Sequence, residues 1–379
     1  MSVAKSAGYS ESRFRRASLY RWLRRLHLWL SLAAAVPVIL LSLTGALLVY
    51  GHELEAMVLP AVDPIVPNGK PLSYRAILDH VAQQKPEVTV WSVTPARIDD
   101  QPWRLWLGGG AGVLDIDPYT GRVLRQYKPS ESPYGIVKAL HRRWLVPGKP
   151  WAKWARNATS AISLALMVQV VIGIWLWGLP SKRLRRLQPD FRHSGRLAVQ
   201  RLHMSCGVVV SAILLLIAFT GIAMWWHESI EPIVETVTAS RVEKPTDPVA
   251  DGLAPLADLD TAIALALAAV PDSTIAHFRA PKVTGEPLML NLHTPDTHVV
   301  SRVWVGDDPP RVLQLYDGRQ ATAATWFWQM RYWLHLGDFA GWPVRLLWLI
   351  VALTPTGFVL SGLWLWRDRH RPRTARQAG

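Results

Sequence analysis

The sequence predicts an α-helical membrane protein: a four-helix transmembrane bundle built from two repeats, each with an extracytoplasmic α+β module. The 379 residues are 50% hydrophobic and include 20 Trp, a residue that gathers at membrane–water interfaces. Four apolar stretches are long enough to cross a bilayer. A short histidine-containing pattern also occurs twice along the chain. The four predicted spans are 28–50, 158–178, 207–226 and 342–366.

Two prolines fall inside predicted spans, Pro37 in the first and Pro355 in the fourth. Membrane helices accept proline where neighbouring groups bond the carbonyl that the missing N–H leaves free. Both spans are therefore kept. The first span is also too long for the core of a signal peptide, so we expect it to remain as a membrane anchor.

The net charge of +14 is concentrated in three segments. Residues 1–26, 179–202 and 367–379 hold 19 of the 42 Lys and Arg residues but only three of the 28 acidic ones. Four spans place these segments on one side of the membrane, and the positive-inside rule makes that side the cytoplasm. We therefore predict a cytoplasmic arm (1–27), loop (179–206) and tail. Nucleic acid is not expected as a partner, because the basic segments lack interleaved aromatic residues and a folded basic domain.

The two long loops, 51–157 and 227–341, have the same predicted order of elements. Each begins with an amphipathic helix, Leu72–Gln84 or Leu256–Val270, and continues with alternating strand-like segments. The first loop has strands at Val88–Val93, Trp103–Leu107, Val113–Ile116 and Arg122–Gln126, and the second at Thr274–Phe278, Pro287–Leu292, Val299–Val305 and Val312–Tyr316. A further amphipathic run closes each loop, at Tyr134–Val146 and Thr325–Leu336. We expect these runs to lie at the outer interface or to dock at the mouth of the bundle.

Histidines recur at matched positions of the two halves. Arg25-Leu26-His27 precedes the first span, and Arg201-Leu202-His203 precedes the third. Seventeen positions after each of these histidines comes a Thr-Gly pair, Thr44-Gly45 and Thr220-Gly221. His52-Glu53 and His227-Glu228 follow these pairs, while Leu140-His141 and Leu334-His335 precede the second and fourth spans.

On the predicted topology these histidines form two layers, one at each side of the membrane. His27 and His52 are 25 residues apart, roughly 37 Å along a helix, so a single cofactor cannot use both. Two layers of paired imidazoles fit two b-type haems, because imidazole is a usual axial ligand of haem iron and helical bundles host such cofactors. We predict that His27 pairs with His203 and His141 with His335. His52 and His227 are the alternative outer ligands.

Other residues near these histidines suit the same cofactor. The small residues Thr44, Gly45, Thr220 and Gly221 would let helices or a macrocycle approach closely. Nearby arginines are placed to pair with haem propionates: Arg24, Arg25, Arg201, Arg142 and Arg143. A single histidine at a membrane edge is often only a solvated side chain, so the prediction depends on the repetition. The single cysteine, Cys206, excludes an intramolecular disulfide and clusters held by several cysteines.

Four segments carry a resemblance to a known family. They are RWLRRLHLWLSL with SLTGALLVY in 21–50, ALHRRWLVPGKPWAKW at 139–154, QRLHMSCGVVV with AFTGIAMWW in 200–226, and YWLHLGDFAGWPVRLLW at 332–348. Together they resemble the PepSY-associated transmembrane family over nearly the whole chain, and Asp117–Leu124 resembles the turn and last strand of a PepSY module. Within that family the architecture is most similar to integral-membrane siderophore reductases of the ferrioxamine type. Gly306–Leu313 departs from the pattern where the second Thr-Gly turn would be.

The resemblance implies a di-haem b-type reductase of the bacterial inner membrane, with two periplasmic PepSY-like modules. It would pass electrons to a periplasmic ferric siderophore, of hydroxamate type, docked between the modules and the bundle mouth, and release Fe(II). The implied haem ligands are His27, His141, His203 and His335. Because the sequence has no dinucleotide fingerprint or flavin domain, the electron donor would be quinol or a cytoplasmic reductase. The alternatives are a non-redox chelate transporter or sensor, and a quinol-linked di-haem cytochrome with another acceptor.

Overall fold

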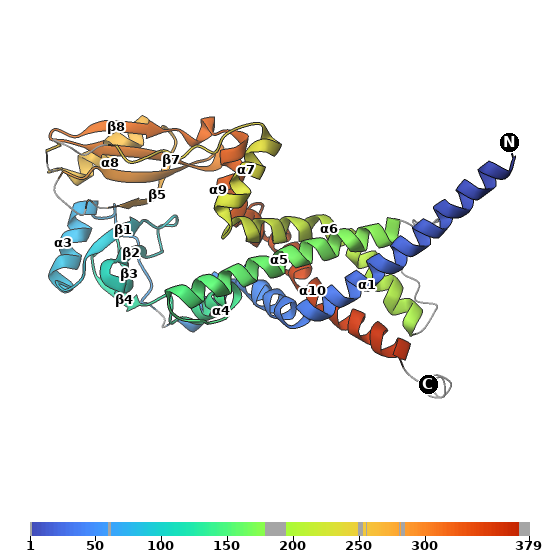
Figure 1. Ribbon diagram of the computed structural model, residues 1–379. Coiled ribbons are helices and arrows are strands. Elements are labelled where there is room, and N and C mark those ends of the chain that lie inside the picture. Colours follow the sequence, from blue (N-terminus) through green and yellow to red (C-terminus); the bar gives the residue numbers. More distant parts are fainter. Residues whose placement is uncertain are drawn as a thin grey trace. The chain divides into compact units, whose positions relative to one another are not determined.

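The computed structural model describes residues 2–59, 62–178, 195–248, 253–254, 256–279, 281 and 285–370 (Figure 1). Residues 179–194 of the predicted cytoplasmic loop, including His193, and residues 371–379 of the predicted tail lie outside the described residues. The chain divides into two units. One comprises Met1–His52, Val137–Ile230 and Arg331–Gly379, and the other comprises Glu53–Ile136 and Glu231–Met330.

The first unit contains four helices that are long and apolar enough to cross a membrane (Figure 1). They are α1 (Ser2–Val49), α5 (Lys149–Gly178), α6 (Arg196–Ala223) and α10 (Trp342–His370). Within α1 the apolar span is Ala17–Val49. The four predicted spans are thus confirmed as helices, and the chain is a multi-pass membrane protein. Both α1 and α6 pack against α5 and against α10, so the four helices form one bundle.

Hydroxyl groups compensate for the proline inside α10. Pro355 has no N–H to donate to the carbonyl of Val351, four residues earlier. Thr354 Oγ1 donates to that carbonyl instead, at 2.7 Å. Next to it, Ser42 Oγ of α1 donates to the carbonyl of Ala352 at 2.5 Å. The proline is therefore accommodated by hydroxyl hydrogen bonds, one of which also joins α1 to α10.

The second unit contains an antiparallel sheet of eight strands, in the order β4-β3-β2-β1-β5-β6-β7-β8 (Figure 1). Every strand lies within two residues of a predicted segment at each end. The strands are β1 (Val90–Thr94), β2 (Trp103–Leu107), β3 (Gly112–Ile116), β4 (Val123–Tyr127), β5 (Thr274–Arg279), β6 (Leu288–Thr294), β7 (Thr297–Gly306) and β8 (Arg311–Tyr316).

The two loops contribute to one sheet, where we had expected a sheet in each loop. Their first strands pair antiparallel, with Ser92 opposite Arg279 and Val93 opposite Phe278. Val93 and Phe278 are completely buried. An unpaired β1 or β5 would leave a row of backbone groups and apolar side chains at an exposed edge, and the pairing removes both edges at once.

Helices α3 (Tyr74–Gln84) and α8 (Leu259–Ala269) bury their apolar residues in the same core as the sheet. Ile77 of α3 and Ile263 of α8 belong to this core. Both helices begin two or three residues later than predicted because a polar side chain caps each of them. Ser73 accepts a hydrogen bond from the N–H of Ala76, and Asp258 accepts one from the N–H of Thr261.

Four shorter helices connect the loops to the membrane spans. α4 (Pro133–Arg143) and α9 (Ala323–Leu336) correspond to the two predicted closing runs. α2 (Gly51–Val58) and α7 (His227–Thr238) follow the first and third spans and were not predicted. Two single turns of 3₁₀ helix, Gly108–Gly110 and Gly318–Gln320, complete the described elements.

A buried carboxylate ties β2, β3 and β4 together. Asp115 is completely buried, and it accepts hydrogen bonds from Arg104 Nε at 3.3 Å and Arg125 Nε at 2.7 Å.

Asp115→Ala leaves two guanidinium groups without this partner. We expect the free energy of unfolding to fall by roughly 2–3 kcal/mol, less than for a fully buried ion pair because both arginines reach solvent. Chemical denaturation of the purified chain followed by circular dichroism measures this loss. Asp100→Ala, at an exposed carboxylate, is the control, and equal midpoints for both variants would contradict the prediction.

Candidate functional site

Two histidines from the connecting helices meet in the membrane unit. His141 lies in the last turn of α4 and His335 in the last turn of α9. Their ring centroids are 6.3 Å apart, and the ring planes are inclined by 62°. The sequence predicted this pair from its repeated position alone, and the fold brings the two rings together.

The Thr-Gly pairs of the membrane helices hold these rings. Thr44 Oγ1 donates to the carbonyl of Leu40 at 2.6 Å and lies 2.9 Å from His141 Nδ1. Thr220 Oγ1 donates to the carbonyl of Leu216 at 2.7 Å and lies 3.2 Å from His335 Nδ1. Because each hydroxyl proton is directed to a helix carbonyl, each Thr oxygen is left as an acceptor for the histidine. Thr44 and Thr220 thus bond the imidazoles directly.

Backbone carbonyls fix which ring nitrogen carries the proton. His335 Nδ1 lies 2.8 Å from the carbonyl oxygen of Ile217, and His141 bonds the backbone of Leu41, the corresponding residue of α1. A carbonyl can only accept, so Nδ1 of His335 carries the hydrogen. Nδ1 of His141 carries it as well, because the proton of the neighbouring Thr44 hydroxyl is already directed to the carbonyl of Leu40. In a neutral imidazole the lone pair is then on Nε2. Both rings therefore present the nitrogen that a metal can bind.

The two rings are held in the neutral form. Burial lowers the pKa of His141 to about 3, and the neighbouring His335 and Arg142 lower it further in the same direction. Burial also lowers the pKa of His335. Near neutral pH neither ring is protonated on Nε2, which keeps the lone pair available.

Glycine allows the rings to lie against the membrane helices. A Cβ atom at Gly45 would be 3.2 Å from His141 Cε1, and one at Gly221 would be 3.0 Å from His335 Cε1. Both distances are shorter than normal side-chain contacts. A larger residue at either position would therefore move the ring.

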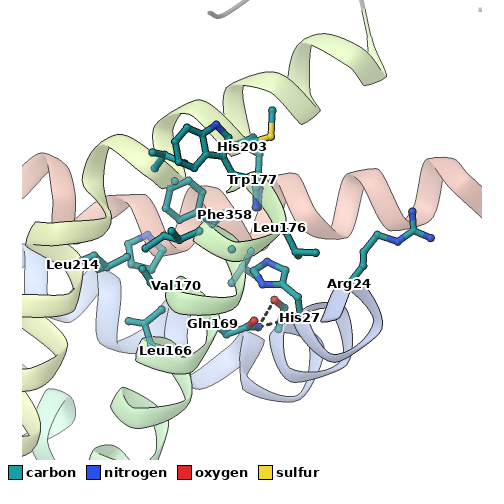
Figure 2. Close-up of a pocket in the computed structure, with 18 of the residues that line it drawn as sticks. Arg24, His27, Leu166, Gln169, Val170, Leu176, Trp177, His203, Leu214 and Phe358 are labelled. Carbon is teal, nitrogen blue, oxygen red and sulfur yellow. Dashed lines mark hydrogen bonds between the residues drawn. The ribbon is translucent and has the colours of Figure 1, made fainter. Parts of the chain in front are cut away.

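His27 and His203 line a cavity of about 280 Å³ inside the bundle (Figure 2). All four membrane helices contribute to its wall, which is mostly apolar. The lining residues include Leu166, Val170, Leu176, Leu214 and Phe358. The volume is far more than a few waters need, since one water occupies about 30 Å³ of liquid. The cavity is therefore large enough to admit part of a bulky apolar group between the two imidazoles.

The two inner histidines have different partners. His203 Nδ1 lies 2.7 Å from Ser361 Oγ, whose own proton is directed to the carbonyl of Gly357 at 2.7 Å. Nδ1 of His203 therefore donates, and its Nε2 is free for a metal. His27 Nδ1 is buried with no hydrogen-bond partner in the described part of the chain.

Gln169 occupies the helix wall beside His27. Its Nε2 donates to the backbone carbonyl of His27 at 2.9 Å and to Ser31 Oγ at 2.5 Å, while its Oε1 is buried without a partner among the residues described. Our sequence reasoning missed both Gln169 and Ser361. The available signal was a polar side chain inside a mostly apolar span, which is costly there and often functional.

The family model for the PepSY-associated TM region matches residues 24–369. The chain belongs to the PepSY-associated transmembrane family. The match includes α1 from Arg24 onward, all of α5 and α6, α10 except its last residue, and all eight strands. No curated protein matches the chain.

Most of the remaining predicted site residues of this PepSY-associated protein are exposed. His52 and His227, at the starts of α2 and α7, are exposed, and His227 Nδ1 donates to the carbonyl of Trp225 at 3.2 Å. They stay predictions as alternative outer ligands. Arg24 lines the inner cavity, but in Figure 2 its side chain extends away from the two imidazoles. Arg25 and Arg142 are exposed, and Arg201 and Arg143 are half-buried.

The imidazoles of His141 and His335 in this PepSY-associated protein suit a metal that brings most of its own ligands. Among the described residues no three His, Cys, Asp or Glu side chains gather to hold a metal ion. Two imidazoles with no third protein ligand would suit haem, whose iron takes most of its ligands from the porphyrin. His141 and His335, with ring centroids 6.3 Å apart, would hold such a group from two different helices.

The lowered pKa values predict a pH dependence of stability. The folded-state pKa of His141 is about 3 and its ordinary value is 6.5, so between these values the unfolded chain takes up a proton that the folded chain does not. The stability contributed by the neutral ring is complete above pH 6.5 and is lost as the pH falls toward 3. We expect the melting temperature of the wild type to approach that of His141→Gln as the pH is lowered from 7 to 5. Differential scanning fluorimetry in detergent measures this difference.

The control for this prediction is His298→Gln, at an exposed histidine of the sheet unit. Its difference from the wild type should stay constant over the same pH range. If the difference for His141→Gln also stays constant, the neutral buried imidazole is not a source of stability.

Proposed function

We propose that this protein is a di-haem b-type reductase of the bacterial inner membrane, which passes electrons across the membrane to a ferric siderophore of hydroxamate type and thereby releases Fe(II). The observation that carries the proposal is the arrangement of two histidine pairs in one bundle, in which hydrogen bonds at Nδ1 leave Nε2 of His141, His335 and His203 free. Each pair takes one histidine from each half of the chain.

His27 with His203 would hold one haem, and His141 with His335 the other. When bound, haem supplies reversible one-electron chemistry at its iron. The protein's own residues supply the rest. Thr44, Thr220 and Ser361 orient the rings, and the apolar cavity wall excludes water. Of the five arginines, Arg24 lines the inner cavity and is the best placed to neutralise a carboxylate there.

We also propose that the two halves are repeats that meet about a pseudo-two-fold axis. Two contacts support this interpretation, because Thr44–His141 in the first half has the same form as Thr220–His335 in the second. The strand order supports it as well, since the sheet reads outward from the β1–β5 pair in the same sequence on both sides. The proposed orientation keeps both termini in the cytoplasm, following the positive charge of the terminal and middle segments.

Two cofactors are required by the thickness of the membrane. The hydrocarbon core is about 30 Å thick, too far for one efficient electron-transfer step. The inner pair would accept an electron from quinol or a cytoplasmic reductase, and the outer pair would deliver it. Reduction releases the metal because hard oxygen chelators hold Fe(III) far more tightly than Fe(II).

The ligand assignment is tested by single histidine substitutions. His27→Ala, His203→Ala, His141→Ala and His335→Ala should each remove one of two haem signals, so the haem content per chain falls by about half. The visible spectrum of the reduced protein and the pyridine haemochrome assay measure this. If His141→Ala or His335→Ala leaves both signals, the outer ligands are His52 and His227. A colourless wild-type protein would leave a transporter or sensor as the function.

The positioning role of the glycines has a matched control. Gly45→Ala and Gly221→Ala should shift the electron paramagnetic resonance signal of the outer haem alone, because the added Cβ pushes His141 or His335. Gly362→Ala changes a third membrane glycine, which does not line the inner cavity and where an added Cβ meets no atom within 4 Å, and it should match the wild type. Equal effects of all three substitutions would mean that helix packing, not ring position, is disturbed.

The acceptor is tested with the reduced protein. After removal of excess dithionite, addition of a ferric hydroxamate siderophore should reoxidise the haems and yield Fe(II), which ferrozine detects. A metal-free siderophore is the control. If the haems stay reduced with the ferric chelate but are oxidised by quinone, the protein is a quinone-linked cytochrome with another acceptor.

A further inference from the structure

A basic pocket lies at the start of the second membrane helix. Its volume is about 410 Å³, and it opens to the outside of the bundle. Four cationic side chains line it, Arg143 at the end of α4 and Lys149, Lys153 and Arg156 in the first turns of α5. Trp225, beyond the end of α6, completes the wall with Gly148 and Ala152.

The four cations have no anionic partner among the described residues. Among the described residues none of them forms an ion pair with Asp or Glu, and no acidic residue lines the pocket. Four positive charges within one concave surface repel one another, which costs folding free energy unless an anion lies among them. The composition therefore indicates an anionic ligand.

Hydrogen bonds and stacking fix the arginines in place. The Arg156 guanidinium lies 4.6 Å from the centre of the Trp225 ring, a cation–π contact. Asn157 Oδ1 accepts hydrogen bonds from the indole N–H of Trp225 at 2.7 Å and of Trp226 at 3.1 Å. Arg156 Nε is buried without a hydrogen-bond partner among the described residues. The face of the guanidinium thus stacks on Trp225, and its Nε donor has no acceptor in the described part of the chain.

The loop before α5 is also shaped by this arrangement. Arg143 Nη1 donates to the carbonyl of Val146 at 2.8 Å. Trp144 and Leu145 adopt positive φ angles of 54° and 60°, a conformation that costs free energy for residues other than glycine. The turn brings Arg143 back toward Lys149, so that the end of α4 and the start of α5 face one pocket.

The location of the pocket indicates which anion it takes. It lies at the end of a membrane-spanning helix, among tryptophans that are typical of the headgroup level of a bilayer: Trp144, Trp151, Trp154, Trp225 and Trp226. Lipid phosphates are the anions present at this depth at high local concentration. The N-terminus of α5 adds the positive end of a helix dipole to the side-chain charges.

We propose that this pocket binds the phosphate of an anionic phospholipid headgroup, such as phosphatidylglycerol. The guanidinium groups of Arg143 and Arg156 would bond the phosphate oxygens, Lys149 and Lys153 would add flexible charge at the rim, and the acyl chains would follow the apolar surface of the bundle. No ligand histidine lines the pocket, and Arg143 is the one residue that this inference shares with the haem proposal.

The test uses the full chain purified in a non-ionic detergent. Short-chain phosphatidylglycerol, phosphatidylcholine and inorganic phosphate are each titrated, and binding is followed by tryptophan fluorescence. We expect saturable binding of phosphatidylglycerol that weakens with salt, and a loss of affinity of roughly tenfold or more in Lys149→Gln/Lys153→Gln. Lys70→Gln/Lys85→Gln removes the same charge in the sheet unit and should bind like the wild type.

Three outcomes would overturn the proposal. Equal binding of phosphatidylglycerol and phosphatidylcholine would mean that the charge does not select the lipid. Tight binding of inorganic phosphate with the same dependence on the lysines would identify a site for a free anion. Unchanged lipid binding in Lys149→Gln/Lys153→Gln, together with loss of a haem signal, would assign the pocket to the carboxylates of a cofactor.

Discussion

The hydrogen bond that each outer histidine donates from Nδ1 is the interaction on which the rest of the site depends. An imidazole inside a helical bundle has one N–H to satisfy, and helix carbonyls there are normally occupied by the helix itself. Thr44 and Thr220 supply an acceptor, because each sends its own proton to the carbonyl four residues earlier and offers its oxygen to the ring. Together with the Ile217 carbonyl, which also accepts from His335 Nδ1, these oxygens fix the tautomer, the ring orientation and the docking of α4 and α9 against the bundle.

The glycine after each threonine leaves the space that the histidine ring needs. The hydrogen bond needs a ring within about 3 Å of a helix surface, and a Cβ at the next residue would occupy the space of Cε1. A Thr-Gly pair therefore supplies both the acceptor oxygen for the ring and the space beside it. The pattern was recognisable in the sequence because it recurs at a fixed distance after His27 and His203. The interaction itself was not, since its partner lies 97 residues away in one half and 115 in the other.

Local sequence patterns predict some parts of the fold, whereas contacts between residues far apart in the sequence determine the others. All eight strands and the helices α3, α4, α8 and α9 follow from local alternation or helical periodicity. The pairing of β1 with β5 depends on Val93 meeting Phe278 across a separation that no local pattern encodes. Helices α2 and α7 were missed because each continues directly from a span, and their polar first turns resemble the end of a helix more than the start of one. The roles of Ser361 and Gln169 follow only from the structure, which places Ser361 beside His203 and Gln169 beside His27.

The inner and outer pairs differ in the hydrogen bonds that their rings donate. In the outer pair both Nδ1 atoms donate to oxygen, whereas in the inner pair His203 donates to Ser361 and His27 Nδ1 has no acceptor among the described residues. A hydrogen bond donated from Nδ1 makes Nε2 a stronger donor to a metal. If both pairs hold a metal, the outer pair would therefore bind it more strongly.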